Sequence, residues 1–248
     1  MAESKKACWF EEWFDSDYYH LLYKDRDFAE AETLIRNLVW YLNIPKEVRI
    51  LDLACGKGRH SIFLNALGFN VTGVDLSENS IHQAKTNEND TLHFKVGDMR
   101  EPQGDEDFDL VLNLFTSFGY FESEEENTKT LSAIHQALKP GGKLVLDFMN
   151  SSKVLRQMIP KAEVRKGDVL FEIEKSVENQ IIRKKISFED QGKSRYFEEK
   201  VMAITRSDFM RYFEKTGFEF VHLSGNYLLE EYSEPDSERM IFIVRKPD

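Results

Sequence analysis

The chain has 248 residues and a formal net charge of −11, with 41% hydrophobic and 31% charged residues. This length supports a sizeable core and the composition is that of a globular protein, so we expect a single domain spanning residues 1–248. No apolar run approaches the ~20 residues of a membrane span. The acidic balance argues against nucleic-acid binding, which uses Lys and Arg to replace counterions. Cys8 and Cys55 suggest no disulfide framework, and the N-terminus lacks a signal-peptide pattern, so we expect a reduced, cytoplasmic setting.

Residues 1–45 are expected to form an N-terminal helical arm. The arm opens with a segment rich in aromatic residues and acids, residues 9–19. Between Phe28 and Leu42, apolar residues recur at helical spacing, and Pro45 then ends the helix.

The segment ILDLACGKGRH, residues 50–60, predicts a buried strand that runs into a glycine turn and then a helix. Gly56 and Gly58 let the backbone turn tightly and approach a ligand closely, because they carry no Cβ. A strand, a glycine turn and a helix N-terminus together make a site for the polar end of a nucleotide-like ligand.

A second apolar strand, NVTGVDLS at residues 70–77, ends in Asp75, nineteen residues after Gly56. An acid at this position accepts hydrogen bonds from a ribose diol, in folds that bind NAD and in folds that bind S-adenosylmethionine. Two details favour the second ligand. The third glycine of the NAD fingerprint is replaced by Ser61, and Asp52 lies in the first strand, where it could meet an ammonium group.

Further apolar strands alternate with helices along the chain. LHFKVG (92–97) ends in Asp98-Met99, and FDLVLNLF (108–115) and KLVLDFMN (143–150) follow. Ser123 and Glu126 predict a capping box at the start of the helix before the last of these strands. Residues 205–248 are expected to complete the core with a helix and a β-hairpin.

Taken together, DLACGKGRH, VTGVDLS, GDM, FDLVLNLFTSFGYF and LKPGGKLVLDFMN resemble the class I S-adenosylmethionine-dependent methyltransferases, and GRH and TSFGYF resemble a bacterial small-molecule branch. The resemblance covers residues 15–150 well and 205–248 more weakly. Ala54 departs from the family pattern, where a glycine opens the loop. The resemblance implies an α/β, Rossmann-like fold: a seven-stranded, mostly parallel sheet with helices on both faces and an antiparallel last strand.

The resemblance also implies contacts with the cofactor, S-adenosyl-L-methionine, in a cofactor-binding core at residues 46–150. The Asp98 carboxylate would accept from the adenine amino group, with Met99 against the ring. The arm would fold over the cofactor, with Tyr19 near the sulfonium and Arg26 paired with the cofactor carboxylate. The expected cofactor-binding residues are Tyr19, Arg26, Asp52, Ala54, Gly56, Gly58, Asp75, Leu76, Asp98, Met99, Asn113 and Leu114.

The segment after the fourth strand is expected to wall the acceptor pocket with aromatic side chains, namely Phe115, Phe118, Tyr120 and Phe121. None of the six histidines has a spacing that marks it as a base or a metal ligand. We therefore assign no catalytic base, and we expect no metal.

Residues 160–204 alternate apolar and polar residues between turn signals, which predicts a small antiparallel β insertion. We interpret it as a lid over the acceptor site, with a dimer surface as the alternative. A basic cluster falls within it, and we interpret this cluster as a solvated strand face: Arg165, Lys166, Arg183, Lys184 and Lys185.

The predicted function is in-line transfer of a methyl group to nitrogen or oxygen of a small-molecule acceptor, leaving S-adenosyl-L-homocysteine. An amine acceptor is slightly favoured, because a neutral amine needs no base before attack. Two alternatives stay open: an NAD-dependent oxidoreductase on a similar fold, and an S-adenosylmethionine-binding protein with other chemistry or a protein acceptor. We expect a monomer or a homodimer.

Overall fold

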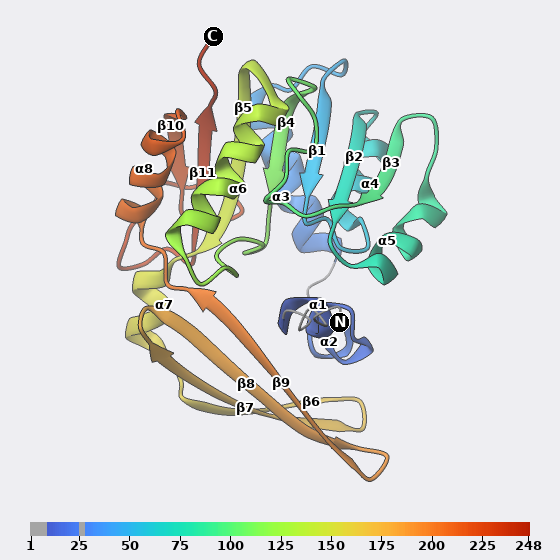
Figure 1. Cartoon of the computed structure of the whole chain (residues 1–248), viewed down its shortest axis with the longest axis vertical. Helices are drawn as coiled ribbons and strands as arrows, with labels where there is room; N and C mark the ends of the chain where they lie inside the picture. The colour runs from blue at the N-terminus through green and yellow to red at the C-terminus, as the bar shows by residue number, and fades with distance from the viewer. Residues whose placement is uncertain (1–8, 25–27) are drawn as a thin grey trace, which may run out of the picture.

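Two β-sheets organise the computed structural model, which describes residues 9–24 and 28–248 (Figure 1). The larger sheet has seven strands in the order β10-β11-β5-β4-β1-β2-β3. Their bounds are β1 Arg49–Leu53, β2 Asn70–Asp75, β3 Leu92–Val96, β4 Phe108–Asn113, β5 Leu138–Met149, β10 Glu219–Ser224 and β11 Arg239–Arg245. Among these strands, β11 alone runs opposite in direction to the other six. The predicted fold class is confirmed, including the antiparallel last strand.

Helices cover both faces of this sheet. On one face, α6 (Glu124–Ala137) and α8 (Arg206–Lys215) bury apolar residues such as Ile134 and Phe209 against the strands. On the other face lie α3 (Phe28–Leu42), α4 (Arg59–Ala66) and α5 (Glu78–Ala84), followed by the 3-10 turn η1 (Lys85–Asn87). The apolar stripe expected in α3 is buried, with Leu34 and Leu38 at most 1% exposed. Within the described residues, no helix is long and apolar enough to cross a membrane.

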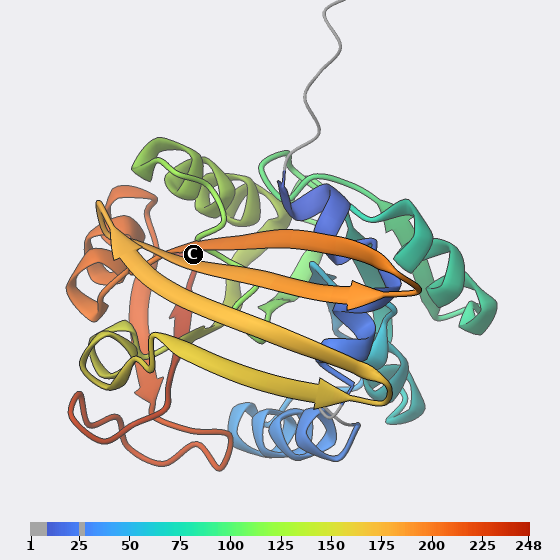
Figure 2. The same cartoon turned by 90° about the horizontal axis from the view of Figure 1, so that it is seen from below.

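The insertion forms a separate four-stranded antiparallel sheet, here called the lid sheet, which follows α7 (Ser151–Gln157). Its strands are β6 Lys161–Lys166, β7 Val169–Glu178, β8 Ile181–Asp190 and β9 Lys193–Met202. Gln191 and Gly192 both take left-handed φ, as the hairpin between β8 and β9 requires. Figure 2 shows the lid sheet lying across the underside of the molecule, below the carboxyl ends of the parallel strands.

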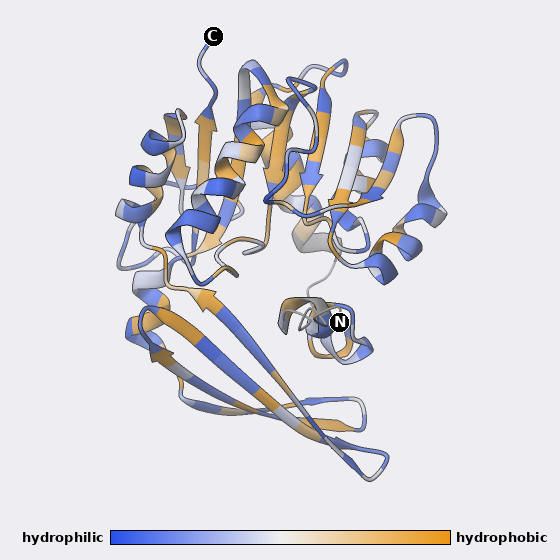
Figure 3. Ribbon diagram, in the orientation of Figure 1, coloured by the Kyte–Doolittle hydropathy of each residue, from blue (hydrophilic) through white to orange (hydrophobic). Residues whose placement is uncertain are grey.

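The lid sheet and the start of the arm share a hydrophobic core of their own. Helices α1 (Trp9–Phe14) and α2 (Asp17–Leu22) pack Trp13 and Leu22 against Phe171, Ile186 and other apolar residues of the lid strands. Figure 3 shows the alternation of hydrophobic and hydrophilic residues along β7–β9 that makes this packing possible. The expected arm therefore divides in two, because α1 and α2 pack on the lid sheet while α3 packs on the larger sheet.

Candidate functional site

The turn after β1 is built from residues in left-handed conformations. Ala54, Gly56 and Gly58 have φ of 63°, 56° and 80°. A Cβ on Gly58 would lie 2.6 Å from the Phe94 ring, whereas one on Gly56 would meet open space. Gly58 is therefore needed for packing beneath the turn, while Gly56 leaves room for a ligand against the backbone. Ala54 holds a conformation that favours glycine, which stores local strain at this turn.

Asp75 joins this turn to the one after β2. Its Oδ2 accepts from the Gly56 amide at 2.8 Å, and its Oδ1 accepts from the Ser77 amide at 2.9 Å. Burial raises the pKa of the carboxyl above its ordinary value, although these amide hydrogen bonds act in the opposite direction. Each oxygen keeps a further lone pair, so the fixed carboxylate can accept from two hydroxyls of a ligand.

Asp52 lies deeper than Asp75, near the end of β1, the strand that leads into the glycine turn. It is 1% exposed, and its Oδ2 accepts from the Ser61 hydroxyl at 2.5 Å. Burial raises its pKa to about 6, against the lowering effect of Ser61. Ser61 stands at the third glycine position of the NAD fingerprint, and the structure shows what it does there: it supplies the hydrogen-bond donor for a buried acid.

The first cavity lies between these turns and the arm, with about 810 Å³ of empty space that is partly open to solvent. Nine of the predicted site residues line it: Tyr19, Ala54, Gly56, Asp75, Leu76, Asp98, Met99, Tyr120 and Phe121. The arm adds Phe10, Phe14 and His20. Most of this wall is apolar, while the carboxylates of Asp75 and Asp98 provide anionic acceptors, as a cationic nucleoside would require.

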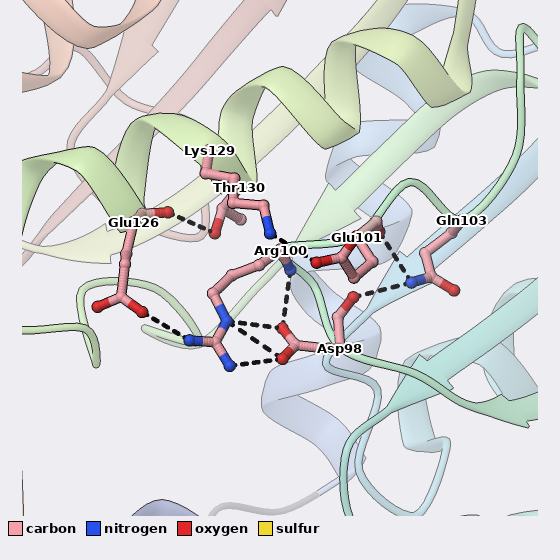
Figure 4. A network of polar contacts seen from close by, with 7 residues as sticks. All are labelled: Asp98, Arg100, Glu101, Gln103, Glu126, Lys129 and Thr130. Atoms are coloured by element: carbon pink, nitrogen blue, oxygen red, sulfur yellow. Dashed lines mark hydrogen bonds and ion pairs between the residues drawn. The ribbon is translucent and has the colours of Figure 1, made fainter.

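Asp98 is held by Arg100, a residue that the sequence did not single out (Figure 4). The guanidinium donates from Nη2 to Asp98 Oδ2 at 2.6 Å and from Nη1 to Glu126 Oε1 at 2.6 Å. Burial raises the pKa of Asp98, but the hydrogen bonds from Arg100 outweigh it and keep the pKa below its ordinary value. The capping box expected at Ser123 is therefore only half formed: Ser123 accepts from the Glu126 amide, while the Glu126 side chain binds Arg100.

A second cavity, with about 1480 Å³ of empty space, lies between the larger sheet and the lid sheet. Phe14, Tyr19 and Tyr120 line both cavities, so these three rings stand where the cavities adjoin. Phe115 and Thr116 form part of the wall on the core side, and Lys184 and Glu199 form part of it on the lid side.

The turn after β4 shapes this second cavity. Phe115 and Thr116 both have left-handed φ, at 58° and 60°, which is rare for an aromatic and a β-branched residue. The fully buried Asp147 carboxylate accepts from the Phe115 amide at 2.8 Å and from Arg239 Nε at 2.8 Å. Arg239 also donates to the Thr116 hydroxyl at 2.9 Å. Asp147 and Arg239 thus hold a strained turn beside the cavity.

Residues 50–142 match the model of the family described as a methyltransferase domain. This stretch runs from β1 to the start of β5, so the glycine turn, Asp75 and Asp98 all lie in the part of the chain that is similar to a methyltransferase domain.

Several proteins that are similar to this chain are also named as methyltransferases. The protein YqeM of Bacillus subtilis is 40% identical over 115 residues, 45% of this chain and 47% of that protein. The glycine/sarcosine N-methyltransferase of Aphanothece halophytica is 27% identical over 243 residues, 95% of this chain and 87% of that protein. A crystal structure of an S-adenosylmethionine-dependent methyltransferase from Clostridium acetobutylicum has a TM-score of 0.79 at 21% identity, covering 93% of this chain and 96% of that one, which shows the shared fold.

The chain spans about half the length of several curated relatives that it matches. The match to the family model ends at residue 142, before the lid sheet begins.

Several predicted site residues lie behind the wall of the first cavity and do not line it. Asn113 is fully buried and donates from Nδ2 to the carbonyls of Leu53 and Ser117, which ties β1 to the turn after β4. Leu114 is 3% exposed and packs in the core, Asp52 is buried in β1, and Gly58 packs against Phe94 on the inner side of the glycine turn. Neither Asn113 nor Leu114 lines either of the two cavities. Arg26 lies outside the described residues.

The structure places Phe118 in the core, and this residue lines neither of the two cavities. Its ring is fully buried, with its centroid 5.7 Å from that of Phe209 in α8. The left-handed turn at residues 115–116 reverses the chain, so Phe118 points back toward α8. Phe115 and Tyr120 do line the second cavity, and Phe121 lines the first.

Two features bear on possible bases and metals. His60 is buried, and burial lowers its pKa to about 3, so its imidazole is neutral at pH 7. It packs against Phe115, with ring centroids 5.0 Å apart. In the part of the chain that the structure describes, no group of three His, Cys, Asp or Glu side chains could hold a metal ion.

Proposed function

We propose that this protein transfers a methyl group from S-adenosyl-L-methionine to a small-molecule acceptor that binds in the second cavity. One observation carries the proposal: the cavity beside Asp75 in the methyltransferase domain adjoins a larger cavity under the lid sheet, and Phe14, Tyr19 and Tyr120 line both. Two reactants in these cavities would meet at the three rings.

The residues of the first cavity fit the cofactor. The Asp75 carboxylate is anchored by two backbone amides and can accept from a ribose diol. Leu76 and Met99 offer apolar surface to a purine, and the Asp98 carboxylate is an acceptor for its amino group. The open space at Gly56 admits the ligand close to the backbone. Aromatic faces such as Tyr19 favour a cation nearby.

Bound S-adenosyl-L-methionine supplies a methyl group on a positively charged sulfur. The chain's own residues hold the two reactants in position and exclude water from them. Holding two reactants in line lowers a barrier by up to ~7–11 kcal/mol. The lid sheet and the arm, joined through Trp13, Tyr23 and Glu199, close the cavity over the acceptor. A neutral amine has a lone pair ready for attack and releases its proton after transfer, so nitrogen is the favoured acceptor atom.

The recessed position of the second cavity also favours a small acceptor over a protein. Its walls come from the arm, the lid sheet and the ends of β5 and β11, and the space is partly open to solvent. The relative from Aphanothece halophytica that aligns with 95% of this chain is named for N-methylation of glycine and sarcosine, which is consistent with a small amine.

The proposal is tested by incubating the protein with methyl-labelled S-adenosyl-L-methionine and a cell extract divided into small molecules and macromolecules. We expect label in the small-molecule fraction, attached to nitrogen by NMR. Asp75→Asn should abolish the transfer, and Asp90→Asn, which changes an exposed acid, should not. Label only on macromolecules, or no transfer despite cofactor binding, would overturn the proposal, and an O-linked methyl would overturn its choice of nitrogen.

A further inference from the structure

The part of the lid sheet that lines the second cavity combines apolar residues, Ile182 and Val201, with one row of charged residues. Along β7 and β8 the same face of the sheet carries buried residues such as Phe171, Ile173 and Ile186. The row consists of Lys175, Lys184 and Glu199, which lie opposite one another on β7, β8 and β9. All three residues line the cavity.

The charges in this row do not balance. Lys184 lies 3.5 Å from Glu199, and Glu199 also accepts from Trp13 at 2.7 Å and from Tyr23 at 2.6 Å. Lys175 forms no ion pair with any acid in residues 9–24 and 28–248, although it lies directly opposite Lys184. Directly opposed side chains have Cβ atoms ~5 Å apart, and like charges at that distance destabilise a sheet. Lys184 is engaged by Glu199 and by Tyr23, whereas Lys175, directly opposite it, adds a positive charge to the cavity wall without an acid partner among the described residues.

The outer face of the same strands shows the opposite arrangement. One residue further along β8, Lys185 is exposed and lies between Glu174 and Glu198 of the neighbouring strands. Charges alternate in sign across this outer row, as they do on a solvated surface. Lys184 and Lys185 were both expected on a solvated strand face, but the period of two places only Lys185 toward solvent and turns Lys184 into the cavity.

Cations also line the core side of the cavity. Lys153 pairs with Glu238 at 2.6 Å, and Arg239 pairs with Asp147 at 2.8 Å. The cavity is thus lined by four cations, Lys153, Lys175, Lys184 and Arg239, and by two acids, Glu199 and Glu238. With Asp147, which pairs with Arg239 from behind the wall, three acids meet four cations among these residues, so one positive charge, that of Lys175, is left over in a chain whose net charge is −11.

We propose that the methyl acceptor carries an anionic group, a carboxylate or a phosphate, that binds across Lys175 and Lys184. An anion between the two ammonium groups removes their repulsion and accepts charge-assisted hydrogen bonds from both. The atom that receives the methyl group lies at the other end of the acceptor, toward Phe14, Tyr19 and Tyr120. This inference rests on the proposed function, because that function assigns the second cavity to the acceptor.

Calorimetric titration with inorganic phosphate and with malonate at low salt tests the anion site without knowledge of the acceptor. The full chain is titrated alone and with S-adenosyl-L-homocysteine present. We expect Lys175→Met, which keeps the length of the side chain, to weaken binding by about tenfold, the loss of one charge-assisted hydrogen bond. Lys185→Met, the matched change on the outer face, should leave the affinity within about twofold. Preference for phosphate or for malonate distinguishes a phosphate ester from a carboxylate.

A second readout separates a binding role from a structural one. Without any ligand, Lys175→Met should raise the thermal unfolding midpoint because it removes a repulsion, whereas Lys185→Met should lower it. Equal anion affinity in wild type and Lys175→Met, equal losses in both variants, or no binding of either anion would overturn the inference. Anion binding that depends on Lys175 in a protein that binds no S-adenosyl-L-methionine would instead overturn the proposed function and leave the anion site standing.

Discussion

Replacing Asp52 by asparagine should change how the stability of this protein depends on pH. The Asp52 carboxyl is 1% exposed, and burial raises its pKa from an ordinary value of 3.8 to about 6. Between these two values the folded state holds a proton that the unfolded state has released. The stabilisation from Asp52 is therefore fully present below pH 3.8 and is lost as the pH rises through about 6.

The size of the effect follows from the two pKa values. Their difference corresponds to about 3 kcal/mol, at ~1.4 kcal/mol for each pH unit. The asparagine side chain of the variant exchanges no proton, so the free energy of unfolding of Asp52→Asn minus that of wild type should increase by about 2–3 kcal/mol between pH ~4 and ~7.5. Taking this difference cancels the titration of all groups that the two proteins share.

Urea unfolding, followed by tryptophan fluorescence at intervals across this pH range, measures the difference directly. Asp90→Asn is the matched control, because Asp90 is exposed and its substitution should give a difference that stays nearly constant. A difference between Asp52→Asn and wild type that stays flat, or that falls as the pH rises, would refute the reasoning from burial.

Further predictions concern packing and buried charge. Gly58→Ala should destabilise the protein by about 2 kcal/mol or more in urea unfolding, because a Cβ would meet Phe94 at 2.6 Å, while Gly56→Ala, facing open space, should cost only about 1 kcal/mol. Equal costs would contradict this view of the turn. Arg239→Met should cost about 3–5 kcal/mol, since it leaves the fully buried Asp147 carboxylate without its cation, whereas Arg245→Met, which breaks an ion pair on the surface, should cost less than about 1 kcal/mol. A small loss in Arg239→Met, measured in the same way, would mean that the Phe115 amide and the Tyr227 hydroxyl are enough to hold the Asp147 carboxylate.

The sequence predicted the larger sheet well because its signals are local. Each strand was a short apolar run, and glycines or acids followed at its carboxyl end, as Gly56, Asp75 and Asp98 do. The carboxyl ends of parallel strands meet at one edge of the sheet, so the residues that follow these strands were expected to lie together. Asp75, Asp98 and Met99 indeed line one cavity.

The parts that the sequence did not predict depend on contacts between distant segments. Trp13 and Tyr23 bind Glu199, which is 186 and 176 residues away, and no local pattern announces such a pairing. The burial of Phe118 depends on two left-handed residues, Phe115 and Thr116, whose types give no hint of that conformation. Arg100 resembled any surface cation until the fold brought it between Asp98 and Glu126.

Two residues could have been found from the sequence. Asp147 is an acid inside an apolar strand, the same signal that drew attention to Asp52, and the structure shows it fully buried. Lys184 follows the period of two through Ile182, Lys184 and Ile186, which places it on the apolar face of β8. Lys185, the next residue, falls on the opposite, solvated face. Applying the period of two to the charged residues as well as to the apolar ones would have separated these two lysines.

Calorimetric titration of the purified protein with S-adenosyl-L-methionine and S-adenosyl-L-homocysteine, alongside NAD(H), tests the central claim most directly. We expect micromolar binding of the first two ligands and none of NAD(H). Asp75→Asn should weaken that binding by about tenfold or more, because one acceptor for the ribose diol becomes a donor, and Asp90→Asn should not change it. Binding of NAD(H) in place of S-adenosyl-L-methionine, or cofactor binding that is indifferent to Asp75, would contradict the account.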